Sequence, residues 1–186
     1  MFPFNLPNFL TLVRILLVPV VVAALLAETP NADTLAAIVF AVAAFTDGLD
    51  GYIARSRGSI TTFGKLMDPI ADKLLIIAPL ISLVSLGRVA AWVAMVIIAR
   101  EFAVTALRMV AAEQGVVVPA SVLGKAKTIT QVAAILAVIA FQSTPLAVDL
   151  LLYVAVAVTV VSGIDYFFGI RRQVEEARRK RLSVSG

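Results

Sequence analysis

The chain has 186 residues, of which 61% are hydrophobic and 15% are charged, and its net charge is +4 at pH 7. Soluble globular domains are rarely this hydrophobic. Six membrane-spanning helices of about 20 residues each would use roughly two thirds of the chain and leave too little for a separate soluble domain of ordinary size. We therefore expect one all-α domain over residues 1–186, embedded in the membrane, and not a soluble enzyme with a membrane tether.

Six hydrophobic segments follow one another along the chain. The first is too long for the core of a signal peptide and has no basic residues before it, so we expect it to be a span. The second is interrupted by Asp47, and we expect it to continue as a helix whose polar part faces protein. The expected helices cover 10–27, 34–55, 61–86, 89–112, 121–141 and 146–170, followed by a basic tail (171–186) that is helical at 171–181.

Basic residues are distributed unequally between the two ends of these helices. The turns at 28–33 and 142–149 contain no Lys or Arg, and the turn at 86–89 contains only Arg88. By the positive-inside rule, the opposite end and both termini are expected to face the cytoplasm. Attraction of the tail to anionic lipid explains its charge without a catalytic role. The basic end is formed by Arg55, Arg57, Lys65, Arg108, Lys125, Lys127 and six residues of the tail.

Four aspartates lie inside segments that are expected to span the membrane, where carboxylates are costly and usually functional. Asp47 and Asp50 are three residues apart, and Asp68 and Asp72 are four apart, so each pair lies on one face of its helix. The two helices are consecutive, and we expect them to be antiparallel neighbours whose acidic pairs face each other near the cytoplasmic end. Four such carboxylates need a cation to remain ionised together.

The chain contains no histidine and no cysteine. This excludes a histidine base, a thiolate nucleophile, disulfides and zinc sites of the usual kind. Oxygen ligands alone favour Mg²⁺ or Mn²⁺, and we expect one or two ions. Such ions suit phosphoryl or phosphatidyl transfer. Small residues on the same helix faces allow close approach of a ligand, and Arg55 can bind a phosphate; the small residues are Gly48, Gly51, Ala54 and Gly64.

The pattern Asp47-x2-Asp50-Gly51-x2-Ala54-Arg55-x8-Gly64-x3-Asp68-x3-Asp72 resembles the signature of the CDP-alcohol phosphotransferases. The resemblance implies a six-helix membrane fold, usually a homodimer, that cleaves a CDP-linked lipid or alcohol and releases CMP. It implies that Asp72 is also the general base for the acceptor alcohol. The implied metal ligands are Asp47, Asp50, Asp68 and Asp72, and the positions expected to bind the CDP-lipid are Asn8, Thr11, Gly51, Arg55, Thr61 and Gly64.

Further segments resemble the bacterial phosphatidylglycerophosphate synthases within this family, namely 8–14, 68–73, Arg100-Glu101 with Arg108, and 123–128. The implied reaction joins CDP-diacylglycerol and glycerol 3-phosphate in the bacterial inner membrane, at a site that faces the cytoplasm. Topology independently brings several cations to the cytoplasmic end, where a small dianion would need them. The expected ligands of the acceptor phosphate are Arg14, Arg100, Arg108, Lys125 and Lys127.

Other functions are compatible with parts of the pattern. The same chemistry with inositol phosphate, serine or phosphatidylglycerol as acceptor would keep the four aspartates. A cation transporter would use them as an ion site, but the charges gather at one end only. A structural scaffold would pair each acid with a nearby Lys or Arg. Glu101 is expected to pair with a residue other than its neighbour Arg100, because adjacent residues of a helix do not face each other.

Overall fold

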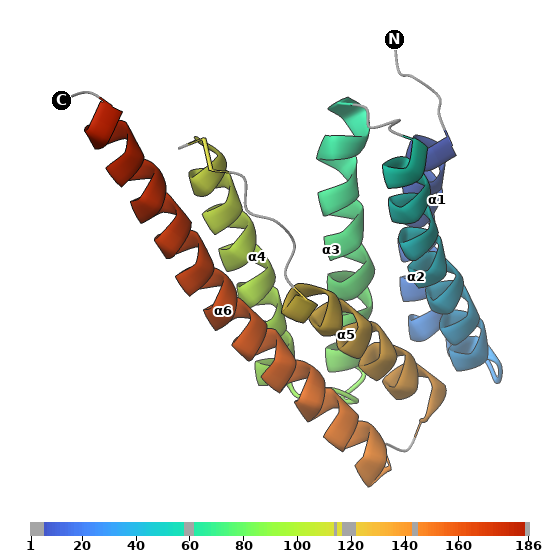
Figure 1. Ribbon diagram of the computed structural model, residues 1–186. Helices are drawn as coiled ribbons and strands as arrows, with labels where there is room; N and C mark the ends of the chain where they lie inside the picture. Colours follow the sequence, from blue (N-terminus) through green and yellow to red (C-terminus); the bar gives the residue numbers. More distant parts are fainter. Residues whose placement is uncertain (1–5, 58–61, 114, 117–121, 143–144, 185–186) are drawn as a thin grey trace.

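The protein is described by a computed structural model over residues 6–57, 62–113, 115–116, 122–142 and 145–184, with side chains described at 8–48, 64, 67–113, 115–116, 122–142 and 145–175. Six helices lie side by side in one bundle (Figure 1). α1 begins and α6 ends at the same end of the bundle, as the charge distribution predicted. The helices are α1 (Leu6–Leu26), α2 (Ala32–Arg57), α3 (Thr62–Ser85), α4 (Ala91–Glu113), α5 (Val122–Ala140) and α6 (Leu146–Val184).

Three helices in the described part are long and apolar enough to cross a membrane, namely α1, α5 and α6. α3 and α4 are also long enough, with 24 and 23 residues, but each carries several charged side chains. These side chains are Asp68, Asp72 and Lys73 in α3 and Arg100, Glu101 and Arg108 in α4. Most of them belong to the polar clusters described below, so charge inside the bundle explains why these two helices have a weaker membrane signal.

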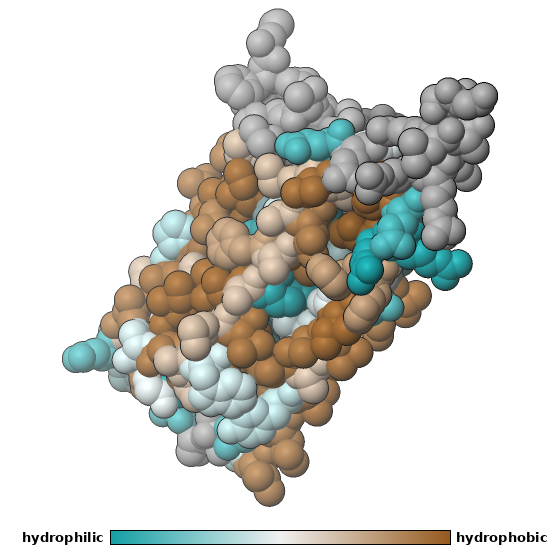
Figure 2. Space-filling model, turned by 90° about the vertical axis from the view of Figure 1, so that its left-hand side faces the viewer, coloured by the Kyte–Doolittle hydropathy of each residue, from teal (hydrophilic) through white to brown (hydrophobic). Residues whose placement is uncertain are grey.

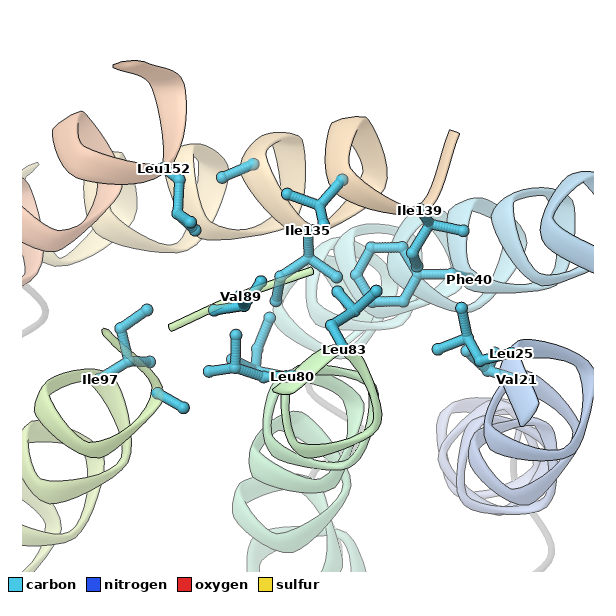
Figure 3. Close-up of a cluster of buried hydrophobic side chains, with 14 of the residues drawn as sticks. Val21, Leu25, Phe40, Leu80, Leu83, Val89, Ile97, Ile135, Ile139 and Leu152 are labelled. Atoms are coloured by element: carbon cyan, nitrogen blue, oxygen red, sulfur yellow. The ribbon is translucent and has the colours of Figure 1, made fainter. Parts of the chain in front are cut away.

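A hydrophobic core fills the half of the bundle opposite to the aspartates (Figure 3). All six helices contribute to it, each from the half that is remote from the aspartate end. Burial of this apolar surface fixes the relative positions of the helices, and it leaves the other half of the bundle for polar side chains. Its buried members include Val21, Leu25, Phe40, Leu80, Leu83, Ile97, Ile135, Ile139 and Leu152.

The packing of the first three helices differs from the expected arrangement. α1 packs closely along both α2 and α3, whereas α2 and α3 contact each other only slightly. The expectation that consecutive antiparallel helices would be direct neighbours was therefore wrong for this pair. α1 presents apolar residues to both helices at its C-terminal half and polar residues at its N-terminal half, which allows it to pack between them.

The basic segment is helical, as expected for 171–181, but it continues the last span without a break near residue 170. α6 is one helix of 39 residues that continues through the basic segment. The segment 171–184 contains no Gly or Pro, and Arg171 Nε donates to Glu175 Oε1 at 3.0 Å, one turn later. Residues with good helix propensity therefore extend the helix beyond the apolar part.

Two side-chain contacts join helices at the end of the bundle remote from the aspartates. Arg88 binds Asp33 through two hydrogen bonds of 2.9 Å each. Trp92 of α4 and Tyr153 of α6 stack with ring centroids 6.0 Å apart. Trp and Tyr near the ends of spanning helices are typical of a membrane interface, so this pair is suited to anchor that end of the bundle.

Candidate active site

Arg14 of α1 lies at the centre of the acidic cluster. Its Nη1 atom is 2.8 Å from Asp47 Oδ1 of α2 and 2.9 Å from Asp72 Oδ1 of α3. Only 1% of the Arg14 side chain is exposed, whereas 53% of Asp72 is exposed. One guanidinium nitrogen therefore joins acids from the two helices on either side of α1, and Asp72 keeps open surface for a substrate.

Asp68 is held by the same face of α1. Thr11 Oγ1 donates a hydrogen bond of 2.7 Å to Asp68 Oδ1. Thr11 and Asn8 are both buried, and they precede Arg14 by one and two helical turns. A polar stripe on an otherwise apolar helix is thus used to orient the carboxylates of α2 and α3.

The remaining expected ligands of the CDP-lipid are only partly described. Gly64 is buried in the first turn of α3, four residues before Asp68. Asp50, Gly51 and Arg55 belong to α2, but their surroundings lie outside the described part of the structure, as does Thr61 altogether. The spacing of Asp47 and Asp50 still places both on one face of α2.

The donor set is suitable for a hard divalent ion. Asp47 and Asp72 face each other across one cationic nitrogen of Arg14, and Asp68 lies one helical turn from Asp72. All these donors are carboxylate oxygens, which Mg²⁺ and Mn²⁺ prefer. Among the described side chains, no three acids are yet close enough together to hold an ion. The suitability of the site for a metal ion is therefore judged from Asp47 and Asp72, the two carboxylates that both contact Arg14.

A second polar cluster joins α4, α5 and α6. Glu101 Oε1 is 2.6 Å from Lys127 Nζ and 3.4 Å from Arg100 Nη1. Arg100 Nη2 donates a hydrogen bond of 2.5 Å to Ser162 Oγ. Glu101 was expected to pair with a residue other than Arg100, and its shorter contact is indeed with Lys127. It also contacts Arg100, which was not expected.

The five expected ligands of an acceptor phosphate are divided among several places. Arg14 binds the aspartates, and Arg100 and Lys127 flank Glu101. Arg108 Nε donates to Tyr166 Oη at 2.8 Å, and its guanidinium carbon lies 4.8 Å from the centre of that ring. Lys125 is exposed on α5. Spacing within each helix placed these cations at one end of the bundle, but it could not predict how they are grouped.

Sequence reasoning expected a partner for Glu101 without naming it, and it missed Ser162 and Tyr166 as members of this polar region. Ser162 and Tyr166 are four residues apart, and Thr159 is three residues before Ser162, so all three lie on one face of α6. Thr159 Oγ1 accepts a hydrogen bond of 2.8 Å from Gln131 Nε2 of α5. Hydroxyl groups at this spacing in a hydrophobic helix were the signal that could have revealed the face.

The two clusters lie near one another. α3, which carries Asp68 and Asp72, packs against both α4 and α5, which carry Arg100 and Lys127. Figure 2 shows hydrophilic residues near the middle of one face of the molecule, surrounded by hydrophobic ones. The acids of α2 and α3 and the cations of α4 and α5 therefore belong to one polar region inside an apolar bundle.

Comparison with known proteins identifies the family. Residues 4–161 match the model of the CDP-alcohol phosphatidyltransferases. The chain belongs to this family. Similar proteins of the family carry the name CDP-diacylglycerol--glycerol-3-phosphate 3-phosphatidyltransferase. The protein from Bacillus subtilis is 47% identical, over 88% of this chain and 94% of its own length. The proteins from Rickettsia bellii and Haemophilus influenzae are 41% and 35% identical over 88% of this chain, and 93% and 91% of their own lengths are covered.

Membership confirms the resemblance that the aspartate and glycine pattern indicated. It also agrees with the all-helical fold, because the matched residues extend from the N-terminal segment into α6. The described members of the signature that lie on α2 and α3 are joined by Arg14 and Thr11 of α1. The signature therefore depends on a third helix that its own spacing does not include.

Proposed function

We propose that the protein transfers the phosphatidyl group of CDP-diacylglycerol to sn-glycerol 3-phosphate, which gives phosphatidylglycerophosphate and CMP. The observation that carries the proposal is the acidic cluster of Asp47, Asp68 and Asp72 around Arg14 and Thr11, in a chain that is 47% identical to a protein named for this reaction. The buried cations of α4 and α5 support an acceptor that carries a phosphate.

Asp72 is proposed as the general base. It is the half-exposed acid of the cluster, and its Oδ1 atom is held 2.9 Å from Arg14 Nη1. Its carboxylate takes the proton of the acceptor hydroxyl, and the resulting oxygen attacks the phosphorus that carries the diacylglycerol. The bond from this phosphorus to the oxygen of CMP breaks, and CMP leaves with the electron pair. Histidine is not required for any of these steps.

Asp47, Asp50, Asp68 and Asp72 would hold one or two Mg²⁺ or Mn²⁺ ions, which would neutralise charge that develops on the phosphate oxygens. Arg14 limits repulsion between Asp47 and Asp72, and Thr11 fixes the orientation of Asp68. The CDP headgroup is proposed to lie over these acids. Its proposed contacts are Asn8, Thr11, Gly51, Arg55, Thr61 and Gly64.

The phosphate of the acceptor is proposed to bind on the side of α4 and α5. Arg100 and Lys127 are the buried cations there, with Arg108 and Lys125 nearer to the end of the bundle. Arg14 already contacts the carboxylates of Asp47 and Asp72, so an acceptor phosphate bound by Arg14 would also lie next to these two acids. Because α5 packs against α3, a phosphate held by Lys127 would leave the acceptor hydroxyl on the side of Asp72.

We also propose that the protein lies in the bacterial cytoplasmic membrane with both termini and the active site on the cytoplasmic side. The clustering of basic residues at the aspartate end supports this orientation. A homodimer is proposed as well, and the apolar side chains exposed on the helices, such as Leu16, Ile81 and Phe168, would suit either lipid or a second copy.

The test is release of CMP by the purified protein in detergent, with CDP-diacylglycerol, Mg²⁺ or Mn²⁺, and one acceptor at a time. We expect release with glycerol 3-phosphate and none with serine, inositol phosphate or phosphatidylglycerol. Release with another acceptor would contradict the assignment of the acceptor. No release with any acceptor, from protein shown to be folded, would contradict the proposed function.

A further inference from the structure

Glu101 has a position in the polar region that the proposed reaction does not yet use. Its Oε1 atom contacts both buried cations of the second cluster, Lys127 at 2.6 Å and Arg100 at 3.4 Å. We propose that Glu101 is a positioning residue that holds Lys127 and Arg100 side by side as the binding site for the acceptor phosphate. This inference rests on the proposed function.

The burial of the three side chains explains why an anion is needed there. Glu101, Lys127 and Arg100 keep only 13%, 10% and 12% of their side chains exposed. Two cations in such surroundings repel each other and lose hydration, and neither remains in place without a negative partner. Lys127 also has a flexible four-carbon chain, so its ammonium group depends on Glu101 for a fixed position.

Arg100 is fixed from two directions. Its Nη1 atom faces Glu101, and its Nη2 atom donates to Ser162 Oγ of α6. Gly163 lies against the same side chain, where an added Cβ would be 3.2 Å from Arg100 Cγ. The small residue leaves room for the arginine to lie flat against α6, so the guanidinium has little freedom to move away from Glu101.

The cluster retains capacity for a phosphate. Glu101 uses a single oxygen for both cations, and a lysine ammonium has three donors while a guanidinium has five. Two cations and one carboxylate leave one net positive charge. The helices of both cations, α4 and α5, pack against α3, so a phosphate bound there places its alcohol on the side of the proposed base. Glu101 itself need not touch the acceptor.

Glu101→Gln separates positioning from simple electrostatics, because the two predict opposite changes. If Glu101 acted only as a negative charge near the phosphate, its removal would lower the KM for glycerol 3-phosphate. If Glu101 positions the cations, Gln leaves them repelling each other and misplaced, and that KM rises. We expect a rise of about tenfold, with kcat and the KM for CDP-diacylglycerol changed less than about threefold.

The experiment measures CMP release by the full-length protein in detergent, with each substrate varied in turn. Glu101→Asp keeps the charge on a shorter side chain, so its KM for glycerol 3-phosphate is expected to lie between those of the native protein and Glu101→Gln. If Glu101→Gln does not fold, Glu101→Asp must itself raise this KM. Asp33→Asn is the matched control, because it breaks an equally buried ion pair at the opposite end of the bundle. It is expected to leave both KM values unchanged.

An unchanged or lowered KM for glycerol 3-phosphate in Glu101→Gln would overturn the positioning role. So would an equal rise in the KM of both substrates, or a Glu101→Asp variant no better than Glu101→Gln, since these indicate a general loss of structure. Failure of the native protein to release CMP with glycerol 3-phosphate is a different result: it would contradict the proposed function and this inference together.

Discussion

Arg14 shows how a single residue organises the acidic cluster. Two carboxylates from different helices contact one of its nitrogens, and Arg14 itself is almost fully buried, with 1% of its side chain exposed. A charge buried in this way is costly unless it is paired. The paired charges of Arg14, Asp47 and Asp72 therefore stabilise one another, and the proposed divalent ion would add a second positive charge near the same carboxylates.

Arg14→Met tests this dependence. The substitution keeps an unbranched side chain but leaves Asp47 and Asp72 without their shared cation. Both carboxylates keep part of their surface in contact with solvent, so the free energy of unfolding is expected to fall by about 1–3 kcal/mol. Mg²⁺ is expected to restore part of this loss, because the ion can take over the positive charge between the carboxylates. The measurement is the thermal unfolding of the purified protein with Mg²⁺ or with a chelator.

Arg171→Met is the matched control, because Arg171 forms an exposed ion pair with Glu175 that contributes little to stability. Its unfolding temperature should stay close to that of the native protein. Mg²⁺ should stabilise Arg14→Met more than it stabilises either the native protein or the control. An equal effect of Mg²⁺ on all three would contradict a shared site for Arg14 and the ion.

At the scale of elements, α4 and α6 are joined by a second, smaller hydrophobic cluster near the aspartate end. Its buried members are Val104, Ala111, Val116, Tyr166 and Ile170. The 39 residues of α6 span about 58 Å, whereas the hydrocarbon core of a bilayer is about 30 Å thick. Part of α6 therefore projects beyond the membrane, and the cluster packs α6 against α4 next to that projecting part, since the apolar span of α6 includes both Tyr166 and Ile170. The cluster keeps Tyr166 in contact with Arg108.

Ile170→Ala is expected to lower the free energy of unfolding by about 2–4 kcal/mol, because it removes buried apolar volume from this cluster. Ile164→Ala makes the same chemical change on the same helix at a residue that is 53% exposed, and it should have little effect. Thermal or denaturant unfolding of the two variants gives the comparison. Equal losses in both would show that the α4–α6 cluster does not stabilise the projecting part of α6.

The sequence predicted the elements well because hydrophobic runs and breaks in polarity define membrane helices directly. All six expected helices are present, with ends within a few residues of the expected ones except at the start of α1 and the end of α6. The helical tail was expected, but its continuity with the last span was not, because hydropathy ends where the apolar surface ends, while the propensity of Arg, Glu and Ala for helix continues.

At the scale of the whole molecule, the division into a hydrophobic half and a polar half was also predictable. The position of α1 between α2 and α3 was not, because apolar faces of similar composition can pair in several ways. For the same reason Glu101 received no role: spacing defines which residues share a face of α4, but the partner helix α5 brings Lys127 to it. Motif spacing located Asp47, Asp68 and Asp72, and only the fold showed that Arg14 joins two of them.

The central claim is that transfer to glycerol 3-phosphate takes place at the aspartate cluster, with Asp72 as the base. The most direct measurement is CMP release that depends on glycerol 3-phosphate, compared between the native protein, Asp72→Asn and Asp149→Asn. Asp149 lies in the first turn of α6, at the end of the bundle remote from the cluster. Loss of a general base should lower kcat by a factor of about 10²–10⁴ in Asp72→Asn, whereas Asp149→Asn should match the native rate. Full activity in Asp72→Asn would contradict the account.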